Sequence, residues 1–299
     1  MSFDDGARLD PGRVRAGGRG RRAGGIAVGG GLGGLALVLL VMFLGGNPGD
    51  LDALMGGVGE APVDETAQGD LATRCQTGAD ANEYTDCRMV GAVNSLDAYW
   101  VDALPAAGFE LEFPGVTLFE ASAQSGCGTA SSSTGPFYCP PDQTIYLDVA
   151  FFDVLESQFG ASGGPLAQMY VMAHEYGHHL QNQMGVFEIA DRSGAGADSD
   201  SVKVELMADC LAGVWASHAA TVPDESGTPF LEPLTAADVA DAVSAAEAVG
   251  DDRIQEAVQG EANPHTFTHG TAEQRRDSFM TGYDTGDIAQ CDAFGVLAG

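Results

Sequence analysis

Basic residues are scarce in this sequence. Only 13 of its 299 residues are Lys or Arg, against 43 Asp and Glu, so the formal net charge is −30. Binding to nucleic-acid phosphates needs clustered Lys and Arg, and the shortage therefore argues against a nucleic-acid partner. Such acidity is typical of a solvated surface that keeps a protein soluble, with a specific cationic partner as the alternative interpretation.

The six cysteines lack the C-x-x-C spacing that marks a zinc ribbon or a redox motif. Their even number favours disulfides in an oxidising compartment, with buried free thiols as the alternative. Six cysteines permit 15 pairings. The two pairs that are close in sequence are the most economical, which leaves the remaining two cysteines as a third pair. The expected disulfides are thus Cys75–Cys87, Cys127–Cys139 and Cys210–Cys291.

The basic residues that are present are unevenly placed, because six of the 13 lie before position 23. Residues 23–46, AGGIAVGGGLGGLALVLLVMFLGG, then carry no charge and can cross a hydrocarbon core of roughly 30 Å as a helix. Arginines on its N-terminal side place that end in the cytoplasm and send the following chain across the membrane. A cleaved signal peptide is the competing interpretation, but no clear A-x-A cleavage pattern follows, which favours an uncleaved anchor.

The composition divides the chain into four parts. Residues 1–22 are rich in Gly and Arg and are expected to form a disordered cytoplasmic tail before the transmembrane anchor at 23–46. Residues 47–72 are rich in Gly, Pro and acidic residues and indicate a flexible linker. Residues 73–299 would then form one extracytoplasmic domain of a single-pass protein of the cell membrane, attached to the lipid bilayer through the span.

The domain starts with a few strand-like segments and continues with a helical majority. A helix is predicted at 89–104, and strands at 116–123 and 143–149 are separated by a loop rich in Gly, Ser and Pro at 125–142. From residue 150 the apolar spacing is helical. Helices are expected at 150–159, 165–185, 200–220, 235–249, 251–259, 271–282 and 287–297. This order of elements predicts an α+β domain.

The stretch AHEYGHHLQNQ at 173–183 carries a recognisable chemical pattern. On the helix predicted there, His174 and His178 lie about 40° apart around the axis, so both imidazoles can face one ion. Glu175 lies beside that ion, as in H-E-x-x-H motifs, where the glutamate polarises a metal-bound water. His179 lies about 100° further round and is expected to pack behind the site. For this motif alone, an exposed polar helix face is the alternative.

A catalytic zinc ion needs a third protein ligand and an open position. The next long helix carries VELMADCLAGVWA at 204–216, whose apolar stripe leaves Glu205 and Asp209 together on an adjoining face. Carboxylates on a buried helix are costly unless a metal or hydrogen-bond donors balance them. Glu205 is therefore the predicted third ligand, and Asp209 the predicted acceptor for the free N–H of a liganding histidine. An acidic pair at a helix N-terminus is the alternative.

A third segment, FTHGTAEQRRD at 267–277, leads into a helix rich in polar residues. A histidine or arginine from this segment can reach into the cleft and stabilise an oxyanion. His269 is the candidate histidine, with a helix-capping surface residue as the alternative interpretation.

These segments together resemble the bacterial neutral zinc metallopeptidase family, whose members carry a single N-terminal membrane span. The resemblance covers nearly the whole exported part and rests on CGTASSSTGPFYCPPDQTIYLD, AHEYGHHLQNQMGV, VELMADCLAGVWASH, AVGDDRIQ and FTHGTAEQRRDSFMTGYDTGDIAQCDAF. It implies a zincin-like, mostly helical domain with a small β-sheet and one Zn²⁺ per chain. The residues that it implies are His174, His178 and Glu205 as ligands, Asp209 behind them, and Glu175 as base.

The same resemblance implies a role for two residues of the third segment. In related membrane peptidases, a histidine six positions before an arginine contacts the oxyanion. His269 and Arg275 match that spacing, although Gly270 stands where those relatives usually have proline.

The predicted function is peptide-bond hydrolysis by a membrane-anchored zinc metalloendopeptidase acting on a protein or peptide substrate. A zinc-bound water would attack the carbonyl carbon, with Glu175 as general base. The strand at 143–149 is a candidate for the cleft edge, where it would pair with an extended substrate, or else an ordinary sheet strand. Two alternatives are a non-catalytic, membrane-anchored, zinc-containing module that binds envelope partners, and an amidase acting on peptidoglycan cross-links.

Overall fold

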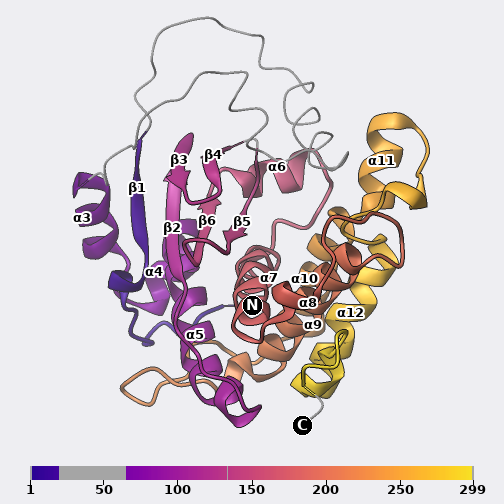
Figure 1. The fold of residues 1–299 in the computed structure, drawn as a ribbon. Coiled ribbons are helices and arrows are strands. Elements are labelled where there is room, and N and C mark those ends of the chain that lie inside the picture. The colour runs from indigo at the N-terminus through magenta and orange to yellow at the C-terminus, as the bar shows by residue number, and fades with distance from the viewer. Residues whose placement is uncertain (1, 20–64, 133, 298–299) are drawn as a thin grey trace, which may run out of the picture.

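The computed structural model describes residues 2–19, 65–132 and 134–297 (Figure 1). The predicted membrane anchor at 23–46 lies outside the described residues, as does the linker up to residue 64. Among the residues that are described, no helix has the length and apolar character needed to cross a bilayer.

A four-stranded sheet forms one side of the molecule, with its strands in the order β1–β2–β6–β5 (Figure 1). Its first three strands are parallel, and the short β5 is antiparallel at the edge. β3 and β4 form a separate antiparallel hairpin. The strands are β1 (Arg15–Arg19), β2 (Gly115–Glu120), β3 (Ser122–Ser125), β4 (Gly128–Ser131), β5 (Phe137–Cys139) and β6 (Thr144–Asp148).

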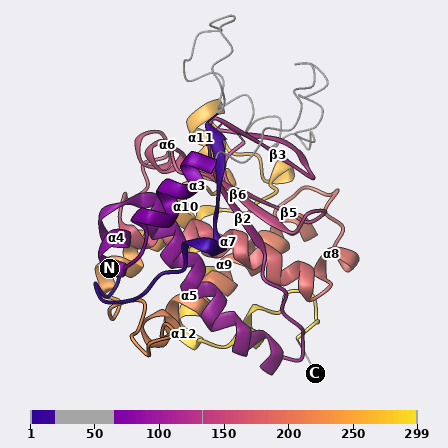
Figure 2. The same ribbon diagram turned by 90° about the vertical axis from the view of Figure 1, so that its left-hand side faces the viewer.

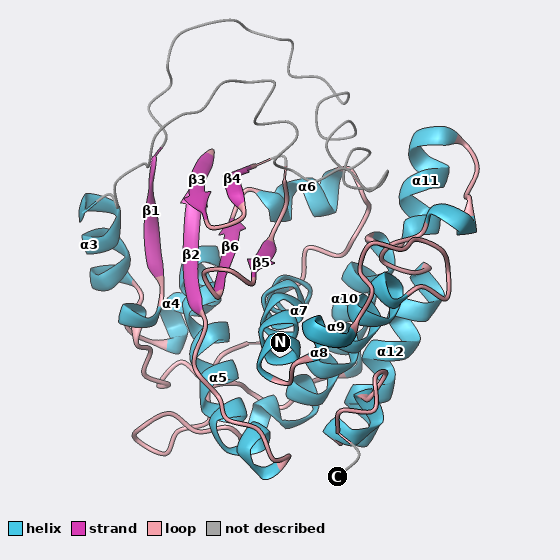
Figure 3. Ribbon diagram, in the orientation of Figure 1, coloured by secondary structure: helices cyan, strands magenta, loops and turns pink. Residues whose placement is uncertain are grey.

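Long helices pack against one another beside this sheet; in Figure 3, α5 lies below the sheet and the others lie to its right. α7 is central, because it contacts β5, α5, α9 and α10, and α9 in turn packs on α12. The long helices are α5 (Thr85–Ala106), α7 (Pro165–Gln183), α9 (Asp200–His218), α10 (Ala236–Ala248) and α12 (Ala272–Thr285). The shorter ones are α3 (Glu65–Arg74), α4 (Gly78–Glu83), α6 (Phe151–Ser157), α8 (Val186–Ile189) and α11 (Asp251–Gln259). Single 3₁₀ turns are η1 (Pro11–Arg13), η2 (Ala219–Thr221), η3 (Pro264–Thr266) and η4 (Ile288–Cys291).

A glycine at the crossing of α7 and α9 allows the two helices to approach closely. A Cβ atom at Gly177 would lie 3.0 Å from the backbone of Ala208, closer than side chains ordinarily pack. His178 follows this glycine on α7, and Asp209 follows Ala208 on α9. The close crossing therefore brings the predicted site residues of the two helices together.

The predicted helices of the second half are largely present, whereas several short elements differ. The expected loop at 125–142 contains β4 and β5, and the expected strand at 116–123 breaks into β2 and β3 at Ala121, whose φ is +70°. The helix expected at 287–297 is reduced to η4. There the Asp292 carboxylate accepts backbone N–H groups of three later residues, which offers those groups an alternative to helical bonds.

All three predicted disulfides are confirmed: Cys75–Cys87, Cys127–Cys139 and Cys210–Cys291. The first joins the residue after α3 to α5, and the second holds the loop before β4 against β5. The third joins α9 to the C-terminal turn η4, across a sequence separation of 81 residues.

The prediction that residues 1–22 form a disordered tail is wrong for residues 2–19. Phe3 and Val14 are at most 2% exposed, and a Cβ at Gly91 of α5 would lie 2.4 Å from the Phe3 ring. Arg13 forms a 2.6 Å ion pair with the buried Asp97 of α5. The Gly- and Arg-rich composition gave no sign that this segment is folded. Its few apolar side chains and one paired arginine are nevertheless sufficient to dock it.

The N-terminal segment, residues 2–19, is part of the same folded body as the rest of the described chain (Figure 2). Its strand β1 pairs directly with β2 of the sheet. This pairing makes residues 15–19 part of the domain's sheet, whereas the position of the chain relative to a membrane stays a prediction. α3 contacts β1, so residues 65–72 also belong to the domain rather than to the predicted linker.

Candidate metal centre

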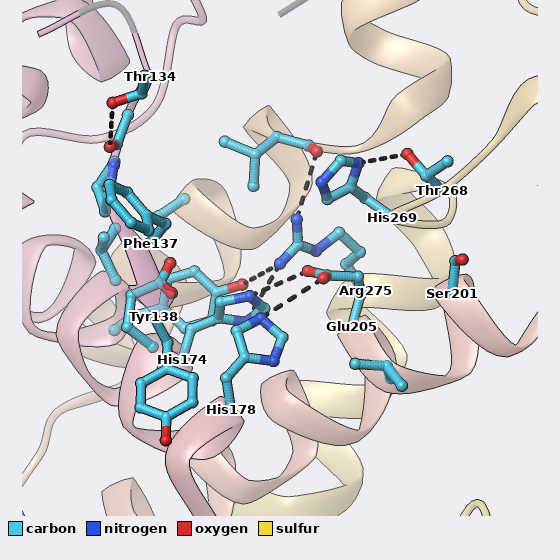
Figure 4. Close-up of a pocket in the computed structure, with 18 of the residues that line it drawn as sticks. Thr134, Phe137, Tyr138, His174, His178, Ser201, Glu205, Thr268, His269 and Arg275 are labelled. Atoms are coloured by element: carbon cyan, nitrogen blue, oxygen red, sulfur yellow. Dashed lines mark hydrogen bonds and ion pairs between the residues drawn. The ribbon is translucent and has the colours of Figure 1, made fainter. Parts of the chain in front are cut away.

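The predicted ligands His174, His178 and Glu205 meet between α7 and α9 (Figure 4). The Nε2 atom of His174 lies 3.1 Å from one carboxylate oxygen of Glu205, and Nε2 of His178 lies 3.5 Å from the other. The two imidazole rings are 4.7 Å apart and nearly perpendicular. One N or O atom from each of the three residues therefore faces a common point.

The surroundings of His174 favour a cation at this point. Its Nδ1 lies 2.7 Å from the fully buried Asp209, while its Nε2 faces Glu205, so both ring nitrogens point at carboxylates. Burial alone would lower the pKa of His174, but Asp209 and Glu205 raise it to about 10. A neutral imidazole has only one N–H, so the second carboxylate contact needs either another proton or a metal ion.

Asp209 is held by donors from two other helices, α7 and α12. It accepts a hydrogen bond from the Tyr170 hydroxyl and a bidentate pair from Arg275, at 2.8 Å from Nε and 2.9 Å from Nη2. Burial alone would raise the pKa of Asp209, but the positive charges of Arg275 and His174 lower it to about 2. The carboxylate is therefore ionised and fixes the Nδ1–H tautomer of His174 when a metal occupies Nε2.

A supporting residue for His178 was missed by the sequence interpretation. Nδ1 of His178 donates to the Gln181 side chain at 2.9 Å, and Gln181 donates in turn to the backbone carbonyl of Val204 on α9. Gln181 is fully buried. Its position three residues after His178, on the same face of the helix, was the available signal.

Glu175 lines the same cavity and is only 7% exposed. Within the described parts of the chain, no donor forms a hydrogen bond to its carboxylate. The cavity has a volume of about 540 Å³ and is lined by residues of the ligand helices and by several aromatic residues. A buried carboxylate that accepts no hydrogen bond from the described residues is suited to take a proton from a bound molecule.

His269 also lines this cavity, and the buried Asp251 positions it. One Asp251 oxygen accepts the backbone N–H groups of Thr268, His269 and Gly270, at 2.7 to 3.0 Å. The other lies 3.2 Å from Nδ1 of His269. Burial alone would lower the pKa of His269, but Asp251 and the charge of Glu205 raise it. Sequence interpretation missed Asp251, whose one local signal is its place at the start of α11.

Arg275 also lies at the site. Its Nε and Nη2 atoms are engaged by Asp209, and Nη1 lies 3.4 Å from the carbonyl oxygen of Val249. The side chain is buried, so its charge balances the Asp209 carboxylate. The described contacts of Arg275 therefore support a positioning role through Asp209, and its predicted part at the oxyanion stays a prediction, as does that of His269.

His179 packs behind the site, as predicted. Its Nε2 donates to the carbonyl of Glu112, and its Nδ1 accepts from the Tyr138 hydroxyl at 3.1 Å. Burial lowers the pKa of His179 to about 4, so the ring is neutral. Asn182 also donates to the Tyr138 hydroxyl at 3.0 Å, so two residues of α7 fix the edge strand β5 beside the cavity.

The strand predicted for the cleft edge is an interior strand. β6 pairs with β2 on one side and with β5 on the other, so its backbone is not free to bind a substrate. β5, which was predicted as loop, takes the edge position, and its Phe137 and Tyr138 line the cavity (Figure 4).

Comparison with known proteins identifies the family. A family model described as "Putative neutral zinc metallopeptidase" matches residues 5–294. The chain belongs to this zinc metallopeptidase family. The match includes most of the N-terminal segment, in agreement with its place in the fold. No solved structure matches the chain, so the zincin-like assignment of the fold stays a prediction.

Curated relatives of this family member come from distant bacteria. The uncharacterized protein Rv2575 of Mycobacterium tuberculosis is 50% identical over 257 residues, which is 85% of this chain and 84% of the relative. The uncharacterized protein YpfJ of Escherichia coli is 36% identical over 270 residues, or 89% of this chain and 88% of the relative. These names add no activity to the family description.

The metal that the family implies fits the three residues present. Two nitrogens and one carboxylate oxygen are ordinary zinc donors, and three protein ligands leave a position open for chemistry. One donor atom from each of the three residues lies within 4.8 Å of the other two, so the three can share one ion.

Proposed function

We propose that this protein is a zinc metalloendopeptidase that holds one Zn²⁺ per chain at His174, His178 and Glu205. The observation that carries the proposal is the coincidence of a three-ligand site with an unoccupied carboxylate, Glu175, in one cavity. A purely structural zinc site is closed by four protein ligands and has no use for such a base.

Zinc in such a site polarises a carbonyl and lowers the pKa of a bound water molecule towards about 7. The residues of the chain supply the remaining steps. Glu175 accepts the proton of the attacking water and delivers it to the leaving amine. His269, held by Asp251, donates a hydrogen bond to the oxyanion that develops on the scissile carbonyl.

Other residues keep the donors in place. Asp209 and Gln181 each accept the N–H of one ligand histidine, so both imidazoles keep Nε2 free for the metal. Arg275 neutralises Asp209. β5 is the edge strand of the sheet that the described residues form, and an extended peptide can add along it by main-chain hydrogen bonds.

We also propose that the domain acts outside the cytoplasm, because three disulfides persist only in an oxidising compartment. The N-terminal segment would then lie on the same side as the domain. Single-cysteine variants Ser2→Cys and Ser193→Cys, probed in intact cells with a membrane-impermeant maleimide, test this. Both residues are exposed and should be labelled; labelling of Ser193→Cys alone would contradict the shared side.

The activity is tested with purified protein and a panel of internally quenched peptides, casein and cross-linked peptidoglycan. Peptide hydrolysis should cease with a chelator and return when zinc is added. Bound zinc without turnover of any substrate would indicate the non-catalytic module. Cleavage of peptidoglycan cross-links alone would indicate the amidase.

A further inference from the structure

Arg192 places a positive charge at the cavity that contains the predicted ligands. Its guanidinium carbon lies 4.2 Å from the centre of the Phe187 ring, and Phe187 lies 6.4 Å from the ring of His178. These separations put the guanidinium within roughly 11 Å of His178, which two to three residues of extended peptide span at about 3.3 Å each.

The backbone of Arg192 is fixed to the helix that supplies the third ligand. The Ser201 hydroxyl contacts the carbonyl oxygens of both Arg192 and Gly194, at 3.1 Å and 2.7 Å. Ser201 lies one helical turn before Glu205 on α9 and lines the same cavity. The position of Arg192 is therefore tied to the metal site, although its side chain is exposed.

Arg192 differs from other cations around the site in having no carboxylate partner. Lys203 pairs with Asp200, Arg276 with Glu247, and the buried Arg275 with Asp209. For Arg192, no carboxylate among the described residues lies within ion-pair distance. In a protein with a net charge of −30, an arginine that is left unpaired at the cavity is available to an anionic ligand.

The contact with Phe187 suits such a ligand. When a guanidinium lies over an aromatic ring, one of its faces contacts the ring. Its N–H groups stay free to donate, and two of them can bind both oxygens of a carboxylate. The lining of the cavity also includes apolar side chains, which suit a large uncharged side chain of a substrate. These apolar residues are Phe137, Phe151, Phe159, Val171, Val249 and Ile254.

We propose that Arg192 and Phe187 form a carboxylate subsite of the peptidase. This inference rests on the proposed function and names its substrate class: peptides with a large apolar residue at the site and a carboxylate two to three residues from the scissile bond. The carboxylate is supplied by an Asp or Glu side chain or by the C-terminus of a short peptide, since both present the same group.

The test uses quenched peptides that share one apolar core. One set carries Glu or Gln at each position up to three residues on either side of the cleaved bond. A second set ends in a free acid or an amide. Values of kcat and KM are measured for the wild type, Arg192→Ala, Arg192→Lys, Phe187→Leu and the control Lys203→Ala. Lys203 is an exposed cation of α9 that does not line the cavity, so its removal changes the net charge equally.

The wild type should cleave the best carboxylate peptide about tenfold more efficiently than its neutral counterpart, mainly through a lower KM. Arg192→Ala should reduce that ratio to about one, Arg192→Lys and Phe187→Leu should keep part of it, and Lys203→Ala should keep it in full. A preference within the Glu/Gln set would identify a side-chain carboxylate as the bound group, and a preference within the acid/amide set would identify the C-terminal carboxylate.

Two results would overturn the inference and are distinguishable. Hydrolysis with no carboxylate preference, or with a preference that Arg192→Ala retains, overturns the subsite and leaves the peptidase proposal standing. No hydrolysis of any peptide by the zinc-loaded wild type overturns both.

Discussion

Replacement of Arg275 by Met should strongly destabilise the domain. Arg275 is 3% exposed, and its guanidinium supplies two donors to Asp209, which is fully buried. Removing the arginine leaves that charge without its counter-ion. Breaking a buried ion pair from one side costs about 3–5 kcal/mol. At about 2–4 °C per kcal/mol for a domain of this size, Tm should fall by about 6–20 °C.

The measurements are thermal unfolding and urea unfolding, both monitored by tryptophan fluorescence in the presence of a chelator so that zinc does not contribute. Trp100 and Trp215 are at most 1% exposed and report on α5 and α9. The matched control is Arg276→Met. Arg276 is the next residue of α12, but its ion pairs are exposed to solvent, so its loss should change the stability little.

A second variant separates loss of the pair from loss of packing. Arg275→Met combined with Asp209→Asn removes the uncompensated charge and should recover part of the stability lost in the single variant. If Arg275→Met unfolds within about 1 kcal/mol of the wild type, the reasoning about the buried pair is wrong.

Three further predictions concern the support of the site and the N-terminal segment. Gln181→Leu should weaken zinc affinity by about 10–100-fold in competition with a chelating dye, because a ligand histidine loses its acceptor; unchanged affinity would show that Gln181 only packs. Asp251→Asn should lower kcat by about tenfold with KM little changed, since the orientation of His269 matters in the transition state; a rise in KM alone would contradict this role. Asp224 accepts backbone N–H groups from Arg8 and two other residues; burial raises its pKa, but these bonds lower it from 3.8 to about 2. Because that pKa is depressed in the folded state, the contribution of Asp224 is complete above 3.8 and is lost as the pH falls towards about 2. Hydrogen-exchange protection of residues 2–14, taken relative to the intrinsic exchange rate at each pH, should therefore fall over this pH range, and already at neutral pH in Asp224→Asn.

The ligands could be predicted from the sequence because each pair of site residues follows the spacing of a single helix. His174 and His178 share a face of α7 by their spacing alone, and Glu205 and Asp209 share a face of α9 in the same way. The pairing of these two faces was an inference from chemistry, since three donors and a supporting carboxylate complement each other. The close crossing at Gly177 supplies the geometric reason that they meet.

The missed features depend on contacts between distant parts of the chain. β1 is a Gly- and Arg-rich stretch with no strand pattern, and it forms a strand because β2 offers a free edge. β5 is three residues long, too short for any period to show. Asp251 and Arg275 are ordinary surface-type residues in the sequence. Their roles follow from burial against His269 and Asp209, which no local pattern encodes.

Catalysis with Glu175 as the base is tested most directly by Glu175→Gln beside His178→Ala, with zinc content and peptide hydrolysis measured on the same preparations. Gln has nearly the shape of Glu but cannot take up the proton. We predict that Glu175→Gln keeps about one zinc per chain and loses at least about 100-fold in kcat, while His178→Ala loses both zinc and activity. Full hydrolysis by zinc-loaded Glu175→Gln would contradict the proposed mechanism.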